Sequence, residues 1–242
     1  MIPTLAVTAL ILSAAPASAQ SVADPPLVES VKIGDLAGLK AQLRTGADLS
    51  AKDRYGWTAA MWAAGHADAA TLKALLDAGA EPAPQDAAGY SAIIEAAKGG
   101  RGANIALLAA KGLDCSAQDS LGVPAIAYAS SVSTGALTAL VACGASANAR
   151  DAKGLTALIR AAQLGRAPAI RILAAAKAKT DLKDHFGFTA LMWAAHGGWT
   201  DAVSALLAAK ANSTLKSGDG RTAREIALSR EHADAAALLP SP

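Results

Sequence analysis

Asp184, His185 and His196 are the residues whose types and spacing come closest to a metal site in this sequence. Imidazole and carboxylate groups are ligands of Zn²⁺, and this trio would supply one ligand fewer than the four of a structural zinc site. Two cysteines and four histidines do not have zinc-finger spacing either. We therefore interpret His185 and His196 as surface histidines and predict no bound metal or cofactor.

Residues that could carry catalysis are few. The sequence contains no glycine-rich phosphate loop, no Gly-x-Ser-x-Gly nucleophile elbow and no His-Glu-x-x-His helix. Glu95 has no carboxylate or histidine partner at helical spacing, and we interpret it as a solvated surface acid. The sequence therefore predicts a protein that is not an enzyme.

The composition limits both the fold and the partner. Of the 242 residues, 52% are hydrophobic, 4% aromatic and 17% charged. Such a chain is too apolar for disorder and too poor in large side chains for an ordinary single core, which favours closely packed helices. The formal net charge of +2 gives no field that would favour nucleic acid or an anionic membrane surface.

The first 19 residues have the form of a secretory signal peptide. A short apolar run at residues 5–12 is followed by Pro16 and by the small residues Ala17, Ser18 and Ala19. No Lys or Arg precedes the run, so an N-terminal core segment or a membrane anchor is the alternative. We predict cleavage after Ala19 and a linker over residues 20–26. The leader and the Ala-rich composition indicate the periplasm of a Gram-negative bacterium.

One segment recurs five times and determines the architecture. Each copy opens with D-x-x-G, and successive copies are 33, 33, 32 and 33 residues apart, beginning at Asp53, Asp86, Asp119, Asp151 and Asp184. The glycine suits a turn of positive φ, and a Thr or Ser two residues later suits a helix N-cap. A single unit of this kind cannot bury its apolar face alone, so the units must stack into a solenoid.

The unit resembles the ankyrin repeat, with its D-x-x-G-x-T-P-L-H-x-A-A signature and later L-L-x-x-G-A, although Ala replaces the motif Pro and apolar residues replace the motif His. The resemblance implies an all-α solenoid of helix-turn-helix units with β-turn or hairpin tips over residues 27–239. It places an N-terminal cap at 27–52, full repeats at 53–85, 86–118, 119–150, 151–183 and 184–216, and a C-terminal cap at 217–239. In the N-terminal cap we expect only the second half of a unit.

Cys115 and Cys143 lie one repeat apart but about four positions out of register. A periplasmic protein is free to form a disulfide, but the bridge requires Cα atoms within about 7 Å. Because the stacking offset adds to the difference in register, we expect two free thiols.

The nine aromatic residues avoid the Leu and Ala positions that form the core of the repeat. The resemblance implies that the tips and the first helices form a concave surface that binds partners, and aromatic residues are enriched at such interfaces. Basic residues flank the same stripe, at Lys52, Arg54, Arg150, Lys153 and Lys183. The candidate partner-binding residues are Arg54, Tyr55, Trp57, Trp62, Tyr90, Tyr128, Lys153, Phe186, Phe188 and Trp193. In the alternative interpretation, the rings only fasten neighbouring turns to each other.

The sequence thus favours a monomeric, non-enzymatic scaffold of the periplasm that binds a protein with an acidic rim, and neither nucleic acid nor, after signal cleavage, a membrane. The alternative is a small-molecule or metal-binding accessory protein in stress protection, because some secreted bacterial ankyrin proteins are associated with oxidative-stress enzymes. The third full unit is the irregular one, since Pro124 replaces the capping Thr and Ser130 replaces an Ala. We expect it to be the least stable part of the solenoid.

Overall fold

The structure is a computed structural model that describes residues 23–82, 85–86 and 89–240. The predicted signal peptide and the first residues of the linker lie outside the described residues. The described part contains helices and no strand, so the all-α prediction is confirmed. The helices are α1 (Pro26–Ile33), α2 (Leu36–Arg44), α3 (Ala59–His66), α4 (Ala69–Asp77), α5 (Ala92–Lys98), α6 (Gly102–Ala110), α7 (Ala125–Val132), α8 (Thr134–Ala142), α9 (Ala157–Gln163), α10 (Ala167–Ala175), α11 (Ala190–His196), α12 (Thr200–Ala208), α13 (Ala223–Ser229) and α14 (Ala233–Ala237).

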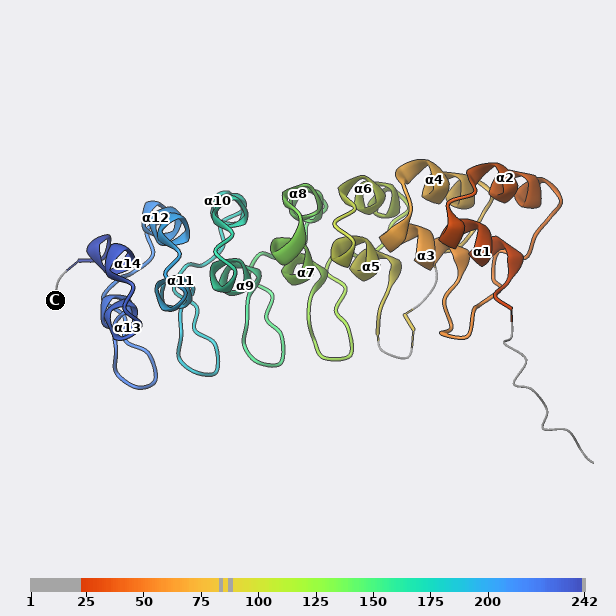
Figure 1. Ribbon diagram of the computed structural model, residues 1–242. Helices are drawn as coiled ribbons and strands as arrows, with labels where there is room; N and C mark the ends of the chain where they lie inside the picture. Colours follow the sequence, from red (N-terminus) through yellow and green to blue (C-terminus); the bar gives the residue numbers. More distant parts are fainter. Residues whose placement is uncertain (1–22, 83–84, 87–88, 241–242) are drawn as a thin grey trace, which may run out of the picture.

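The helices form two rows along an elongated solenoid (Figure 1). The odd-numbered helices, which we call the inner helices, pack against one another in order, α1 on α3 and so on to α13. The even-numbered outer helices form the second row. Between successive helix pairs the chain extends as a long loop on the side of the inner helices (Figure 1). We call the D-x-x-G ends of these loops the tips, and the surface of tips and inner helices the inner face.

The tips are short hairpins set by local sequence. In the first, Asp53 N–H donates to Trp57 O at 3.0 Å, and Lys52 and Thr58 form a β-bridge. The turn needs a residue of positive φ, which Gly56 supplies at 81°. The corresponding glycines of the other units have the same conformation, as the sequence predicts.

Helix capping also follows the prediction. The Thr58 side chain accepts a hydrogen bond from Met61 N–H at the start of α3, and Ser91, Thr156 and Thr189 cap their helices in the same way. Pro124 gives α7 no side-chain cap.

At the ends of the outer helices, glycines such as Gly79 adopt the left-handed conformation, whereas Lys177 and Lys210 hold it at φ of 59° and 62°. These two lysines adopt the left-handed backbone conformation, which is uncommon for residues other than glycine.

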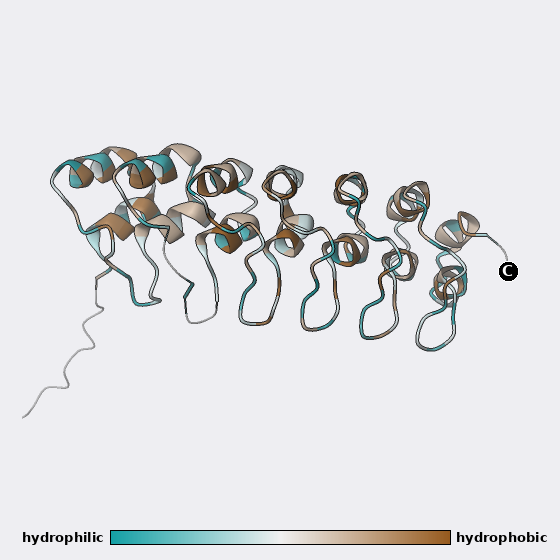
Figure 2. Cartoon of the chain, turned by 180° about the vertical axis from the view of Figure 1, so that it is seen from behind, coloured by the Kyte–Doolittle hydropathy of each residue, from teal (hydrophilic) through white to brown (hydrophobic). Residues whose placement is uncertain are grey.

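The core runs through the whole stack. Large apolar residues of the outer helices, such as Leu72 and Leu75 in α4, are fully buried against the inner helices. Paired alanines such as Ala63 and Ala64 are also buried, and their small side chains allow neighbouring inner helices to approach closely. Among the outer helices, α2 and α4 at the N-terminal end have the most hydrophilic surface (Figure 2), whereas α6 and α8 contain no charged residue.

Two expectations about the fold are wrong. The N-terminal cap contains both helices of a unit, because Leu27, Val28 and Val31 form a buried face that packs α1 on α3. It lacks only the tip that opens the other units. Helix α1 begins at Pro26, inside the predicted linker, since Pro fits the first turn of a helix.

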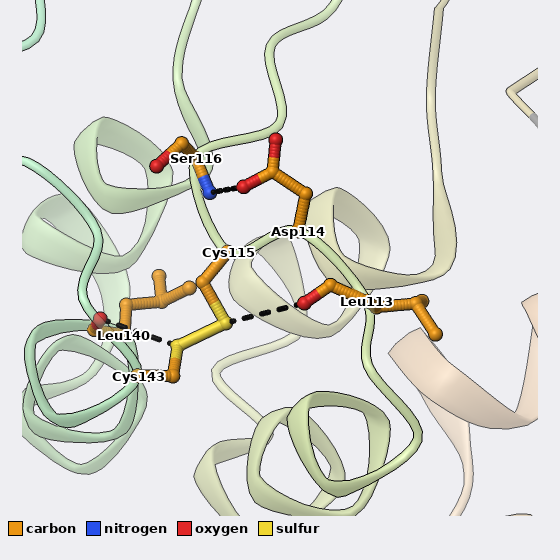
Figure 3. The surroundings of a disulfide bond; sticks show 6 residues. All are labelled: Leu113, Asp114, Cys115, Ser116, Leu140 and Cys143. Atoms are coloured by element: carbon orange, nitrogen blue, oxygen red, sulfur yellow. Dashed lines mark hydrogen bonds between the residues drawn. A yellow bond between two sulfur atoms is a disulfide. The ribbon is translucent and has the colours of Figure 1, made fainter.

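The second correction concerns the cysteines. Cys115 and Cys143 form a disulfide, with Cα atoms 6.2 Å apart (Figure 3). The loop after each outer helix runs towards the C-terminal end of the following outer helix. Cys115, in the loop after α6, therefore meets Cys143, which directly follows α8. The same course of the chain brings Asn148 Oδ1 to Lys179 N–H at 2.8 Å, and Asp181 Oδ1 to Asn212 N–H at 2.9 Å.

Candidate interaction surface

Each tip is fastened to its inner helix through the aspartate that opens the unit. In the first full unit, Asp53 Oδ1 accepts the backbone N–H groups of Tyr55 and Trp57 at 2.9 and 3.0 Å. Asp53 Oδ2 accepts the indole N–H of Trp62, on α3, at 2.8 Å. Burial acts to raise the pKa of Asp53, but these hydrogen bonds and one from Lys32 outweigh it and hold the pKa below its usual value.

The same arrangement recurs with different side chains nine residues after the aspartate. Tyr128 donates to Asp119 at 2.6 Å, Arg160 to Asp151 at 2.7 Å, and Trp193 to Asp184 at 2.7 Å. Burial and the hydrogen bond to Asp119 raise the pKa of Tyr128, which keeps its hydroxyl protonated as a donor. Trp62, Tyr128 and Trp193 therefore fasten the tips of their own units to the inner helices, while their rings stay half-buried on the inner face.

The second full unit departs from this pattern and corrects one expectation. Glu95 holds the donor position but is itself an acid, and it is buried at 2% exposure rather than solvated. Lys98, one turn later, pairs with it at 2.7 Å and lies 3.8 Å from the centre of the Tyr90 ring. Asp86 instead accepts the indole N–H of Trp57 from the preceding tip at 2.8 Å, which ties the first two units together.

The aromatic residues of the first and fifth full units form two similar clusters at opposite ends of the inner face. In the first, the ring of Trp62 lies 4.9 Å from both Trp57 and His66. In the fifth, Trp193 lies 5.2 Å from Phe188 and 5.5 Å from His196. Half-buried rings that keep an open face suit partner contact better than buried ones.

Four of the predicted residues are exposed and take no part in fastening the tips through their side chains. Tyr55 and Phe186, at equivalent positions two residues after the unit aspartate, are 59% and 69% exposed. Arg54 lies over the Tyr55 ring, 4.9 Å from its centre, and Lys153 is exposed at the fourth tip. These side chains are the most accessible part of the predicted binding set.

Two of the basic residues that flank the stripe form hydrogen bonds to the backbone of the following unit. Arg150 donates to the backbone oxygen of Lys183 in the following tip, and Lys183 donates to that of Lys216 at 2.7 Å. Neither cation meets a carboxylate in the ion pairs of the described residues. Arg150 and Lys183, beside the fourth and fifth tips, therefore carry positive charge outside the ion pairs of the described residues.

Two of the three residues considered as metal ligands have other hydrogen-bond partners in the structure. Asp184 accepts hydrogen bonds from the Trp193 indole and from the backbone N–H of Phe186 in its own tip. His196 accepts a hydrogen bond from Arg230 at 3.1 Å. In the described part of the chain, no group of three or more His, Cys, Asp and Glu side chains is placed to hold a metal ion.

Sequence reasoning missed the inter-unit roles of Trp199 and Arg230. The Trp199 indole donates to Gln163 O of the preceding unit at 3.2 Å and packs over Gly165. Arg230 lies on the following unit from His196, which it contacts. The separations of 36 and 34 residues are close to the repeat length of 32 or 33, which was the available signal.

Comparison with known families agrees with this architecture. The family model for ankyrin repeats in three copies matches residues 27–119, 125–217 and 173–241. The chain belongs to the ankyrin-repeat family. Ankyrin repeats are in general protein–protein interaction modules and are typically non-enzymatic. No curated protein matches the chain. None of the described helices has the length and apolarity needed to cross a bilayer.

Proposed function

We propose that this protein is a non-enzymatic scaffold of the bacterial periplasm that binds a protein partner through its inner face. The observation that carries the proposal is the exposure of Tyr55 and Phe186 at the tips of units at the two ends of that face. Keeping large rings in contact with water costs hydrophobic free energy, and this free energy is recovered when a partner covers the rings.

The charges of the tips support a partner with an acidic surface. Arg54 and Lys153 are exposed, and they enter no ion pair among the described residues. The unit aspartates face inward, where Asp53, Asp119, Asp151 and Asp184 are buried and hydrogen-bonded to their own tips. The outer edge of the tips is therefore mainly basic, and electrostatic complementarity favours carboxylates opposite it.

The compartment is part of the proposal. A leader ending in Ala17, Ser18 and Ala19 supports export, and the Cys115–Cys143 disulfide supports an oxidising environment. We propose that the mature chain begins at Gln20 and acts as a monomer. Determination of the N-terminal residue of exported protein tests this part, and a chain that still begins at Met1 would contradict it.

Affinity capture with mass spectrometry tests the binding proposal. The bait is the mature chain, compared with a variant carrying Arg54→Ser, Tyr55→Ser and Phe186→Ser, and with a control carrying Lys73→Ser and Arg171→Ser on outer helices. We expect one protein to be retained by the native chain and the control and lost from the tip variant. Equal retention by all three baits would contradict the proposal.

A further inference from the structure

The fifth full unit holds a small pocket that opens on the inner face. Phe186, Phe188, Trp193 and His196 line a space of about 230 Å³. Because the indole N–H of Trp193 is engaged by Asp184, the ring offers an apolar surface to the pocket rather than a free donor. Phe186, at 69% exposure, forms an open wall.

The size of the pocket distinguishes between kinds of occupant. Sites for cofactors and other drug-sized molecules usually measure about 300–1,000 Å³ and bury most of the ligand. This pocket is smaller and open, which suits a single apolar side chain projecting from a larger partner.

A cation lies beside the pocket. The Arg230 guanidinium donates to His196 Nε2 at 3.1 Å, so this imidazole nitrogen is an acceptor and carries no proton. Glu231 and Asp234 are the nearest acids in sequence, and neither forms an ion pair with Arg230. Asp219 pairs with Arg221, and Glu225 caps α13 through Thr222. Arg230 is exposed and enters no ion pair among the described residues. Its remaining N–H groups are available for a carboxylate, which the planar guanidinium binds well.

The equivalent cluster of the first full unit lacks this property. There the cation is Lys32, which lies 4.4 Å from the centre of the Trp62 ring. Lys32 is already paired with Asp24 at 2.7 Å and with Asp53 at 3.1 Å. Its charge is compensated within the chain, so the two ends of the inner face differ in their attraction for an acid.

We propose that the pocket of Phe186, Phe188, Trp193 and His196 binds one aromatic side chain of an acidic peptide segment, whose neighbouring carboxylate pairs with Arg230. The inference rests on the proposed function, since it names the part of a partner that this end of the inner face would hold. Aromatic contacts supply the buried area, and Arg230 selects segments with an acid beside the ring.

A nuclear magnetic resonance titration of the ¹⁵N-labelled mature chain tests the proposal. The probe is the acetylated and amidated peptide Asp-Glu-Phe-Asp-Glu, compared with versions in which Ala replaces Phe or Lys replaces each acid. We expect the first peptide to shift the indole signal of Trp193, and both altered peptides to bind at least about tenfold more weakly.

Matched variants locate the site. Phe186→Ala and Arg230→Gln should each weaken binding of the Phe peptide at least about tenfold, whereas Lys73→Gln on α4 and Arg171→Gln on α10 should leave it unchanged. Because all four side chains are exposed, the variants are expected to fold. The proposal is overturned if no peptide shifts the Trp193 signal, or if Phe186→Ala and Arg230→Gln bind the Phe peptide as well as the native chain does.

The two proposals fail in different ways. If a captured partner is lost with Arg54→Ser and Tyr55→Ser but retained with Phe186→Ala and Arg230→Gln, the pocket proposal is overturned and the scaffold function stands. If the Phe peptide behaves as expected but no partner depends on the tips, the pocket stands and the scaffold function is overturned.

Discussion

The indole of Trp193 donates a hydrogen bond to Asp184 Oδ2 at 2.7 Å, and the carboxylate that receives it is buried while the ring that provides it is half-exposed. Trp62 and Asp53 repeat the arrangement at 2.8 Å. One edge of each ring thus stabilises its tip while the remaining surface lies on the inner face. Fastening and recognition are therefore compatible in the same residue.

Removal of the indole donor should destabilise the protein. Trp193→Phe keeps an aromatic ring but leaves Asp184 without one charge-assisted hydrogen bond, so we expect the free energy of unfolding to fall by about 1.5 kcal/mol. Urea unfolding measures the change. Phe186→Ala is the control, because this exposed ring should contribute no more than about 0.5 kcal/mol. Equal losses for the two variants would contradict the fastening role.

The disulfide should contribute substantially to stability. It closes a loop of 28 residues, for which the chain-entropy model gives about 3.6 kcal/mol. We expect Cys115→Ala with Cys143→Ala to lower the free energy of unfolding by about that amount, and a reductant to do the same to the native chain only. An unchanged urea midpoint on reduction, or thiols that react freely in the folded native protein, would show that the bond does not form.

The disulfide also encloses the irregular third unit, since α7 and α8 lie between its two cysteines. Pro124 leaves α7 without a side-chain cap, at a cost of about 1 kcal/mol. We expect amide exchange across residues 124–142 to be the fastest among the internal helices, and reduction to accelerate it there more than elsewhere. Hydrogen-exchange mass spectrometry measures both effects, and uniform protection through all five units would refute the expectation.

The junction of the last two units should weaken in mild acid. Burial, followed by the charges of Arg230, His232 and Arg221, lowers the pKa of His196 below its usual value of 6.5. The folded state therefore binds fewer protons than the unfolded state, so this stability is present above pH 6.5 and is lost as pH falls towards the folded-state pKa. Urea midpoints between pH 7.5 and 5 should fall for the native chain and less for His196→Gln. Parallel curves for the two proteins would exclude His196 as the cause.

The sequence predicts what is local to one unit and misses what depends on the contact between units. The positive φ of Gly56 and the caps provided by Thr58 and Thr189 follow from neighbouring residues, and the spacing of the aspartates predicts the solenoid. The Cys115–Cys143 bond and the burial of Glu95 depend on how one unit lies against the next. The shared position of Trp62, Tyr128 and Trp193 was visible as a pattern, but its hydrogen bond to the aspartate required the three-dimensional arrangement.

Site-directed photo-crosslinking tests the central claim, that the inner face holds a protein partner, most directly. A photoreactive phenylalanine analogue replaces Tyr55 or Phe186 at the tips, or Arg171 on α10, in cells that produce the protein naturally. The account predicts a covalent adduct with the same partner from both tip positions and none from position 171. Adducts that form only from position 171, or tip positions that yield no adduct while the protein is folded and present, would contradict it.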